Sequence, residues 1–415
     1  MVGPFVRTKK NNALFQALDD AIDVIPISAL FSGSMRVPIH QTLIDWSITR
    51  ARADMEELSA KFAWLGDADD EGTLKPTMKQ LERFAAAVRV PLGFLFLPAP
   101  PIEEVPIPDF RTMAGAEDTS PSPELLDSIY MAQTRQDWYR SYVLSNDLDR
   151  PKFVGSVAPN ADVEEVAGRI SDQIEFSLAD RSAAKTWAEA LSKLVEQTDD
   201  AGVLVMVNGV VGNNTHRKLD PNEFRGFALS DPIAPLVFVN GADTKSAQMF
   251  TIIHELAHIW LGESALTDST PEDSPSHELE RWCDKVAAEV LVPTADFKEK
   301  VRPNEEIEDA LARLAREYKV STLVILRRLY DIESFSQARF WQLYEDQLER
   351  LRDMMASGSG GNFYNTQNYR VSRRFARALL ESTFNGRTLY GDALRLLSVN
   401  NVNTLKETAQ RLEVV

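Results

Sequence analysis

Two of the chain's five histidines stand four residues apart, with a glutamate directly after the first, in the order His254-Glu255-x-x-His258. On a helix, positions four apart lie on one face about one turn from each other, so both imidazoles can bind one cation. Glu255 is offset sideways on such a helix, where its carboxylate can take a proton from a water molecule and return it to a leaving amine. The alternative is two unrelated histidines that fall four apart. The apolar residues around them favour the first interpretation, a catalytic zinc site set against a core.

A catalytic zinc needs a third protein ligand, because water takes the fourth position. The extended spacing that would supply a third histidine is absent, since Leu261 stands at its glycine position and Ser264 at its histidine position. A carboxylate, or the one remaining nearby histidine, must substitute. The candidates are Glu263, Glu272, His277, Glu278, Glu280 and Glu289.

Helical geometry favours Glu280 among these candidates. Glu280 and Asp284 share one face of a predicted helix, 279–291, and lie one turn apart. With Glu280 as the metal ligand, Asp284 becomes a group that orients an imidazole. The alternative for Glu280 is a solvated charge on the helix surface.

The spacing of apolar residues along the chain predicts the helices and strands that position these candidate residues. Asp243 and Thr244 fit the cap of a helix that runs to Leu261, with a buried stripe of Phe250, Ile253, Ala257 and Trp260. Three short runs rich in β-branched and aromatic residues, bounded by Gly, Asn, Asp and Pro, predict strands at 202–207, 224–229 and 236–239. Helices are predicted at about 124–142, 184–197, 307–330 in two pieces, and 338–355.

With these residues in place, the central part of the chain resembles the ImmA/IrrE metallo-endopeptidases. The resemblance rests on the run from Phe250 to His258, on Glu280-Arg-Trp-Cys-Asp284, and on the helix end at Leu291-Val-Pro293. It implies a zincin-like peptidase domain in which Glu280 is the third zinc ligand. Members of the family usually carry asparagine at the Asp284 position. The resemblance also extends to 224–231 and 235–240, and one of these strands could be the sheet edge along which an extended substrate peptide lies.

Three phrases nearer the N-terminus, at 80–84, 91–98 and 106–112, resemble the subfamily that carries an N-terminal Xre-type helix-turn-helix. The recognition helix of such a module is expected within 63–75. That segment contains four carboxylates, from Asp67, Asp69, Asp70 and Glu71, and residues 41–108 hold eleven acidic against seven basic residues. Acidic groups face phosphates with the wrong sign, so a degenerate module used for protein contact is favoured over a reader of operator DNA. The arginines at 370, 373, 374 and 377 form the better basic patch, and they are expected on the first helix of the last module.

Composition describes an acidic, globular chain. Its 415 residues carry a formal net charge of −17, with 44% hydrophobic and 26% charged residues, which is typical of folded protein and unfavourable for binding phosphate backbones. No apolar run is long enough to span a membrane, and no secretory signal is evident. The single cysteine, Cys283, is expected to be a buried thiol. These features predict a cytoplasmic protein.

The predicted fold class is α+β, a mostly helical multidomain chain with a small β-sheet in its central domain. Prolines between 98 and 108 indicate a stiff linker. The predicted domains are an N-terminal extension (1–34), a helix-turn-helix-like domain with its Pro-rich linker (35–110), a zinc metallopeptidase domain (111–335) and a C-terminal helical module (336–415), with a Gly/Ser joint at 357–361.

Two functions from different classes follow from the resemblance. The first is a regulatory zinc endopeptidase that cleaves a protein, such as a DNA-binding repressor. The second is a binding protein, an antitoxin and transcriptional regulator that neutralises a small nuclease toxin, with the peptidase site conditional or inactive. A metal-dependent sensor with structural zinc is a third alternative. Operator DNA and a second copy of the chain, in a homodimer, remain candidate partners.

Overall fold

The computed structural model describes residues 36–101, 103, 105–107, 121–267, 275–332, 334–356 and 370–414. The chain forms two compact units, which divide near residue 104 and again near 123. The predicted N-terminal extension, 1–34, and the Gly/Ser joint, 357–361, lie outside the described residues. No helix in the described part of the chain is both long and apolar enough to cross a membrane.

The N-terminal unit is a small helical domain with its own core. It contains α2 (Gln41–Arg50), α3 (Met55–Lys61), α4 (Met78–Ala87), two 3₁₀ helices (Ala63–Gly66 and Leu92–Phe96) and an antiparallel pair of short strands, β1 (Ile39–His40) and β2 (Thr73–Leu74). Thr77 caps α4 in a reciprocal capping box with Gln80, as a helix opening at Pro76-Thr77 requires. Phe62, Trp64 and Phe84 pack edge to face at the centre.

The expected recognition helix is not formed. Between residues 63 and 75 the chain makes one short 3₁₀ helix and then the strand β2. Gly72 has a positive φ of 71°, and the Asp69 carboxylate accepts a hydrogen bond from the Thr73 amide and pairs with Lys75. These contacts close a turn instead of continuing a helix, so the segment has no α-helical face to offer a DNA groove.

The second unit is built around a four-stranded sheet with the strand order β3-β7-β6-β8. Its strands are β3 (Leu204–Asn208), β6 (Gly226–Leu229), β7 (Leu236–Asn240) and β8 (Ala265–Thr267). The β3 and β7 strands are parallel, whereas β6 runs antiparallel to both β7 and β8. A separate hairpin joins β4 (Val210–Val211) and β5 (Asn214–Lys218).

This strand order corrects the expectation about the sheet edge. One of the two segments 224–231 and 235–240 was expected to offer the edge for substrate, but they form β6 and β7, and each pairs with a neighbour on both sides. The order of strands in a sheet depends on pairings between distant segments, which the local pattern of β-rich residues does not contain. Among the described residues, β3 and β8 are the outer strands of this sheet.

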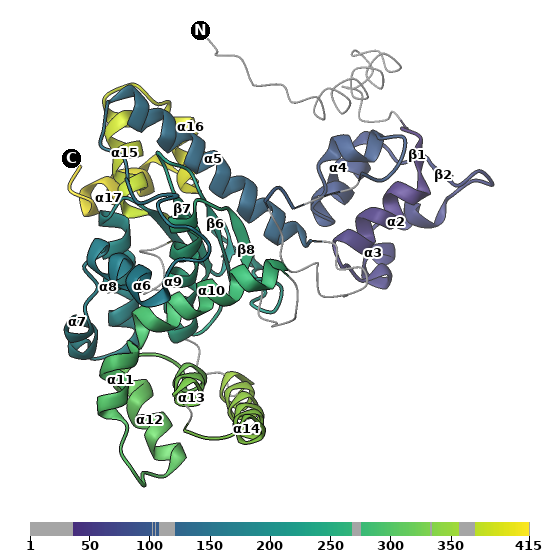
Figure 1. Ribbon diagram of the computed structural model, residues 1–415. Coiled ribbons are helices and arrows are strands. Elements are labelled where there is room, and N and C mark those ends of the chain that lie inside the picture. Colours follow the sequence, from purple (N-terminus) through teal and green to yellow (C-terminus); the bar gives the residue numbers. More distant parts are fainter. Residues whose placement is uncertain are drawn as a thin grey trace. The chain divides into compact units, whose positions relative to one another are not determined.

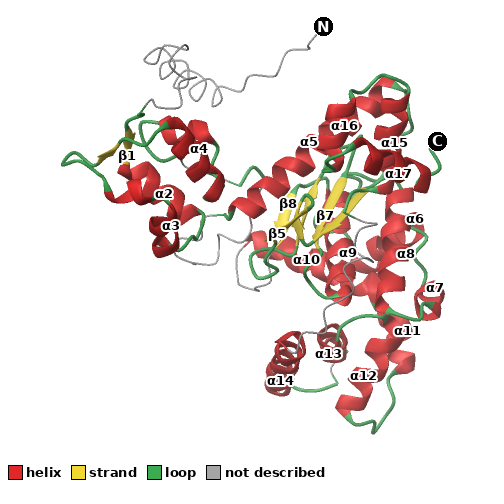
Figure 2. Ribbon diagram, turned by 180° about the vertical axis from the view of Figure 1, so that it is seen from behind, coloured by secondary structure: helices red, strands yellow, loops and turns green. Residues whose placement is uncertain are grey.

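The described second unit contains thirteen helices, of which some lie beside the sheet and others farther from it (Figures 1 and 2). They are α5 (Pro123–Ser145), α6 (Val163–Gln173), α7 (Leu178–Ala183), α8 (Trp187–Asp200), α9 (Lys245–Leu261), α10 (Pro275–Leu291), α11 (Thr294–Lys300), α12 (Ile307–Tyr318), α13 (Thr322–Asp331), α14 (Gln337–Ala356), α15 (Arg373–Phe384), α16 (Tyr390–Leu397) and α17 (Val402–Arg411). The predicted helices and strands are confirmed, with shifts of a few residues at their ends. Arg370, expected on the first helix of the last module, instead precedes α15.

Each face of the sheet packs against a different set of helices, because side chains alternate along a strand. One face packs into a core with α6 and α8 to α10, and its residues include Val205, Val207, Ala228, Val237 and Val239. The other face packs against α5 and α15 to α17, and its residues include Leu204, Met206, Phe227, Leu229, Leu236, Phe238 and Leu266. The α14 helix belongs to the first core and α15 to α17 to the second, so residues 336–415 contribute to both. The chain is a mostly helical α+β multidomain protein, as predicted.

Candidate metal centre

The α9 helix lies at the centre of the second unit and carries both candidate histidines. Every residue from Thr251 to Trp260 is buried, so this helix is apolar almost all round and faces no solvent over that length. Thr244 caps its start by accepting a hydrogen bond from the Ala247 amide, and Gly262 ends it in the left-handed conformation. The predicted cap and end of this helix are therefore confirmed.

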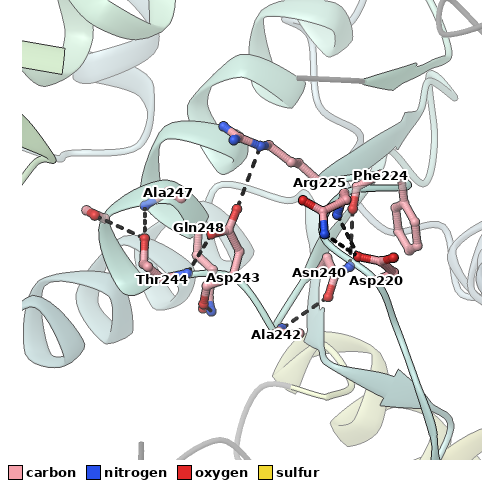
Figure 3. A network of polar contacts seen from close by, with 11 residues as sticks. Asp220, Phe224, Arg225, Asn240, Ala242, Asp243, Thr244, Ala247 and Gln248 are labelled. Carbon is pink, nitrogen blue, oxygen red and sulfur yellow. Dashed lines mark hydrogen bonds and ion pairs between the residues drawn. The ribbon is translucent and has the colours of Figure 1, made fainter. Parts of the chain in front are cut away.

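A network of polar contacts fixes the start of α9 against the sheet (Figure 3). The Gln248 amide donates to the carbonyl oxygens of Gly241 and Asp243, at 3.0 and 2.6 Å. Asn240, the last residue of β7, accepts from the Ala242 amide and donates to the Phe224 carbonyl, just before β6. The network ties β6, β7 and α9 together. The sequence analysis did not identify Gln248 or Asn240, although an asparagine that ends a predicted strand just before a predicted helix cap is a usable signal for such a turn.

Three side chains converge on one point between α9 and α10. The Nε2 atoms of His254 and His258 are 3.2 Å apart, and the Glu280 carboxylate oxygens lie 3.0 Å from the first and 3.2 Å from the second. In a tetrahedral zinc site with bonds of about 2.0–2.1 Å, neighbouring ligand atoms lie roughly 3.3 Å apart. His254 and His258 are buried, and the Glu280 side chain is 16% exposed. The donor types, spacing and burial of this group fit a zinc ion.

The second ring nitrogen of His254 lies against Asp284. Asp284 Oδ1 is 2.9 Å from His254 Nδ1, one helical turn along α10 from Glu280. A proton shared on that side fixes the tautomer that leaves the Nε2 lone pair facing His258 and Glu280. Glu280 and Asp284 therefore contact opposite edges of one imidazole.

Charges at the centre shift the protonation of these groups in opposite directions. Burial alone would lower the pKa of His254, but hydrogen bonds to Asp284 and Glu280 raise that pKa well above its usual value. For Glu280, burial acts to raise the pKa, and the hydrogen bonds from His254 and His258 outweigh it, so the pKa falls. The ionised carboxylates thus stabilise a proton on His254, and a metal ion that displaces this proton would be stabilised by the same negative charge.

The Glu255 side chain is buried on the sheet side of α9. Its Oε1 atom lies close to Gly226 of β6, where a Cβ atom built on the glycine would be 3.1 Å away. The structure thus brings His254, His258, Glu280 and Asp284 into one polar cluster, with Glu255 next to His254 along the same helix.

The remaining candidates for the third ligand lie elsewhere or outside the described residues. Glu263 and Glu278 are exposed. Glu289 pairs with Arg328 at 2.7 Å and accepts hydrogen bonds from the backbone amide and the hydroxyl of Thr294, the first residue of α11. Glu272 and the side chain of His277 are not among the described residues. Cys283 is a buried free thiol, as expected.

Two family models match parts of this chain. Residues 198–330 match a peptidase family model described as the IrrE N-terminal-like domain, and the matched segment runs from the end of α8 through α13. Residues 371–411, which contain α15 to α17, match a domain of unknown function (DUF8813). No curated protein matches the chain. The segment that contains the candidate ligands is thus similar to IrrE-type peptidase domains, a family that implies a metal, usually zinc.

Proposed function

We propose that this chain is a zinc-dependent endopeptidase with a regulatory role, which cleaves a DNA-binding repressor or another partner protein. One observation carries the proposal: a buried triangle of two imidazoles and one carboxylate, with Glu255 next to His254 on the same helix. A structural zinc site would be closed by four protein ligands, whereas three leave a position for water and substrate.

Each residue of the cluster has a role in the proposed reaction. His254, His258 and Glu280 hold the ion, and Asp284 holds His254 in the tautomer that can bind it. Zinc bound there would polarise the carbonyl group of the scissile peptide bond. Glu255 accepts a proton from the attacking water and delivers it to the leaving amine, because a buried carboxylate without bulk water can act first as base and then as acid.

The surface of the N-terminal unit favours a protein partner over DNA. Its segment 63–75 forms no α-helix, and Asp67, Asp70 and Glu71 are exposed there. An exposed acidic surface fits a partner with a basic surface, which both a repressor and a small nuclease toxin carry in order to bind nucleic acid. The antitoxin function is therefore the second candidate, with the same N-terminal contact and a conditional or inactive peptidase site.

Affinity capture separates these two functions. A Glu255→Gln chain, expressed in the native host with wild type as control, should retain its substrate because binding is preserved and cleavage is not. Mass spectrometry of the captured proteins identifies the partner. A repressor that wild-type protein then cleaves, and Glu255→Gln does not, supports proteolysis. Capture of an intact small nuclease by both proteins, without cleavage by either, would replace the peptidase proposal by the antitoxin one.

A further inference from the structure

Small and large residues alternate along β6 according to the face on which they lie. Phe227 and Leu229 belong to the core that contains α5 and the C-terminal helices, whereas Ala228 belongs to the core that contains α9. Gly226 lies two residues before Ala228, on the same face of the strand. The neighbouring strand β7 places valines on that face, Val237 opposite Ala228 and Val239 opposite Gly226. The α9 helix can therefore approach β6 more closely than β7.

Position 226 requires glycine because the packed surroundings leave no room for a side chain, and not because the backbone adopts a conformation that only glycine tolerates. Its φ is not positive, unlike that of Gly262 at the end of α9. A Cβ atom built on Gly226 would lie 2.5 Å from Thr251 Cγ2, 2.8 Å from the Phe238 carbonyl oxygen and 3.1 Å from Glu255 Oε1. Real Cβ atoms do not reach the first two distances, and at the third the carboxylate must give way by a few tenths of an ångström.

The strand cannot retreat from this contact. Gly226 pairs with Val239 on one side and Thr267 on the other, so both edges of β6 are occupied at this residue. The preceding residue, Arg225, accepts a hydrogen bond from the Asn240 amide through its carbonyl oxygen, and its guanidinium lies 3.8 Å from Asp243. Since β6 is held in place, an atom added at position 226 must be accommodated by the groups packed around it, among them Thr251 and the Glu255 carboxylate.

We propose that Gly226 is a positioning residue for Glu255: the bare backbone of β6 is the surface against which the carboxylate rests, and this contact sets its place beside His254. The inference rests on the proposed function only in that Glu255 is the general base. Thr251, one helical turn before Glu255, lies over the same glycine, so the alternative is that Gly226 merely makes room for Thr251.

Two variants separate these explanations. Gly226→Ala adds one methyl group, and Thr251→Ser in the same chain removes the atom closest to it. Ala228→Ser is the matched control, because it also adds one atom to the same face of the same strand. If the glycine serves Glu255, the Gly226→Ala/Thr251→Ser protein should bind zinc as wild type does, with kcat for the captured partner reduced about 10-fold to 100-fold and KM within about 2-fold. Recovery of wild-type kcat in the double variant would mean that the glycine only makes room for Thr251, and this would overturn the proposal.

A crystal structure of the double variant supplies a readout that does not depend on turnover. The Glu255 carboxylate should be displaced away from β6 while His254, His258 and Glu280 keep their places. An unmoved carboxylate overturns the inference. If instead wild type cleaves nothing and the carboxylate is displaced, the proposed function fails and the positioning contact stands.

Stability measurements cover the case in which the added methyl group impairs folding. Glu255→Asp shortens the carboxylate and should partly restore the melting temperature lost in Gly226→Ala, so the two changes should be coupled in a double-mutant cycle. If the effects of Gly226→Ala and Glu255→Asp on the melting temperature were additive, the proposed contact between Gly226 and Glu255 would be ruled out. Failure of every chain that carries Gly226→Ala to fold would also count against the proposal, because the glycine would then be needed for the sheet itself.

Discussion

The Asp199 carboxylate, at the end of α8, accepts a hydrogen bond of 2.7 Å from the backbone amide of Arg374 in the first turn of α15. Ser372, the N-cap of α15, donates its hydroxyl to the same carboxylate. At the far end of the next helix, the buried Arg135 guanidinium donates to the Leu396 carbonyl at 2.8 Å. Residues from elsewhere in the second unit thus satisfy polar groups at the ends of α15 and α16. We infer that the segment matched as a domain of unknown function is an integral part of this unit's fold.

The first prediction concerns the pH dependence of this contact. Burial raises the pKa of Asp199 from its ordinary value of 3.8 to about 6, against the hydrogen bonds from Ser372 and Arg374, which act to lower it. The folded protein therefore binds this proton more tightly than the unfolded chain does. The stability gained from protonation is fully present below pH 3.8 and is lost as the pH rises through 6.

Chemical denaturation of wild type and Asp199→Asn at several pH values tests this prediction. The free energy of unfolding of wild type, relative to that of the variant, should fall by up to about 3 kcal/mol between pH 4 and 7. The exposed neighbour supplies the control, since Asp200→Asn removes a carboxylate that is not buried. A difference between wild type and Asp199→Asn that does not change with pH would contradict the raised pKa.

The second prediction is the metal content. Purified protein should hold about one zinc per chain, because two imidazoles and a carboxylate make a complete catalytic ligand set. His258→Ala and Glu280→Ala should lose most of it, measured by elemental analysis after dialysis. Glu278→Ala is the matched control, since that carboxylate is exposed on the same helix. Full zinc retention in Glu280→Ala would mean that a different residue is the third ligand.

The third prediction concerns Asp284, which contacts Nδ1 of His254 and is not itself one of the three proposed ligands. Asp284→Ala should weaken zinc affinity about 10-fold to 100-fold in competition with a chelator, because the imidazole loses the partner that fixes its tautomer. Asp284→Asn should weaken it less, since the amide oxygen can still accept the Nδ1 proton at 2.9 Å. Equal zinc affinity in wild type and Asp284→Ala would mean that the aspartate is only a surface charge with no role in metal binding.

The fourth prediction separates metal binding from catalysis. Glu255→Gln should keep its zinc and its melting temperature but lose cleavage of the captured partner, because an amide cannot accept the proton of the attacking water. Elemental analysis and a thermal melt supply the controls on the same sample. Undiminished turnover would remove Glu255 from the mechanism.

The local part of the site could be predicted from the sequence because helical spacing is a local property. His254 and His258 share a face through the period of the helix alone, and Glu280 and Asp284 do so for the same reason. That the two faces meet is a tertiary fact, which helical spacing favoured as a hypothesis and the resemblance implied. The 3.0 Å contact between His254 and Glu280 joins residues 26 apart in the chain.

Features that depend on pairing between distant segments could not be predicted. The β6 strand lies inside the sheet because β8, which follows α9 in the chain, pairs with β6. The residues of β6 alone do not indicate that this partner exists. The turn at Asp69–Thr73 replaced an expected helix because a side chain competed for the backbone. Gly226 was overlooked because a glycine in a strand has a meaning only once the element packed above it is known.

The arginine-rich helix, which was the better basic patch by composition, is already engaged within the protein. Arg373 pairs with Glu196 at 2.9 Å, Arg374 donates to the Tyr139 hydroxyl and to backbone carbonyls of α8, and Arg377 donates to the Leu412 carbonyl. These partners occupy the guanidinium groups that would otherwise bind phosphate. A surface of this kind adds little to DNA affinity.

The last prediction is therefore that neither the N-terminal unit nor the full chain binds its own promoter specifically at about 150 mM salt, where the attraction of exposed charges to phosphate is largely screened. Residues 63–75, where the recognition helix was expected, form no α-helix, and the exposed carboxylates of this segment repel phosphate. Mobility shifts with full-length protein and with a 35–110 fragment, which contains a core of its own, measure this directly. A full-length chain carrying Asp67→Lys, Asp70→Lys and Glu71→Lys, with Asp69 kept because it closes the turn at Thr73, is the matched variant. It should gain only weak, sequence-independent binding, because reversing charge supplies phosphate contacts without a helix to read bases. Tight, sequence-selective binding by the wild-type fragment would contradict both the charge argument and the structural one, and would make the N-terminal unit an operator reader.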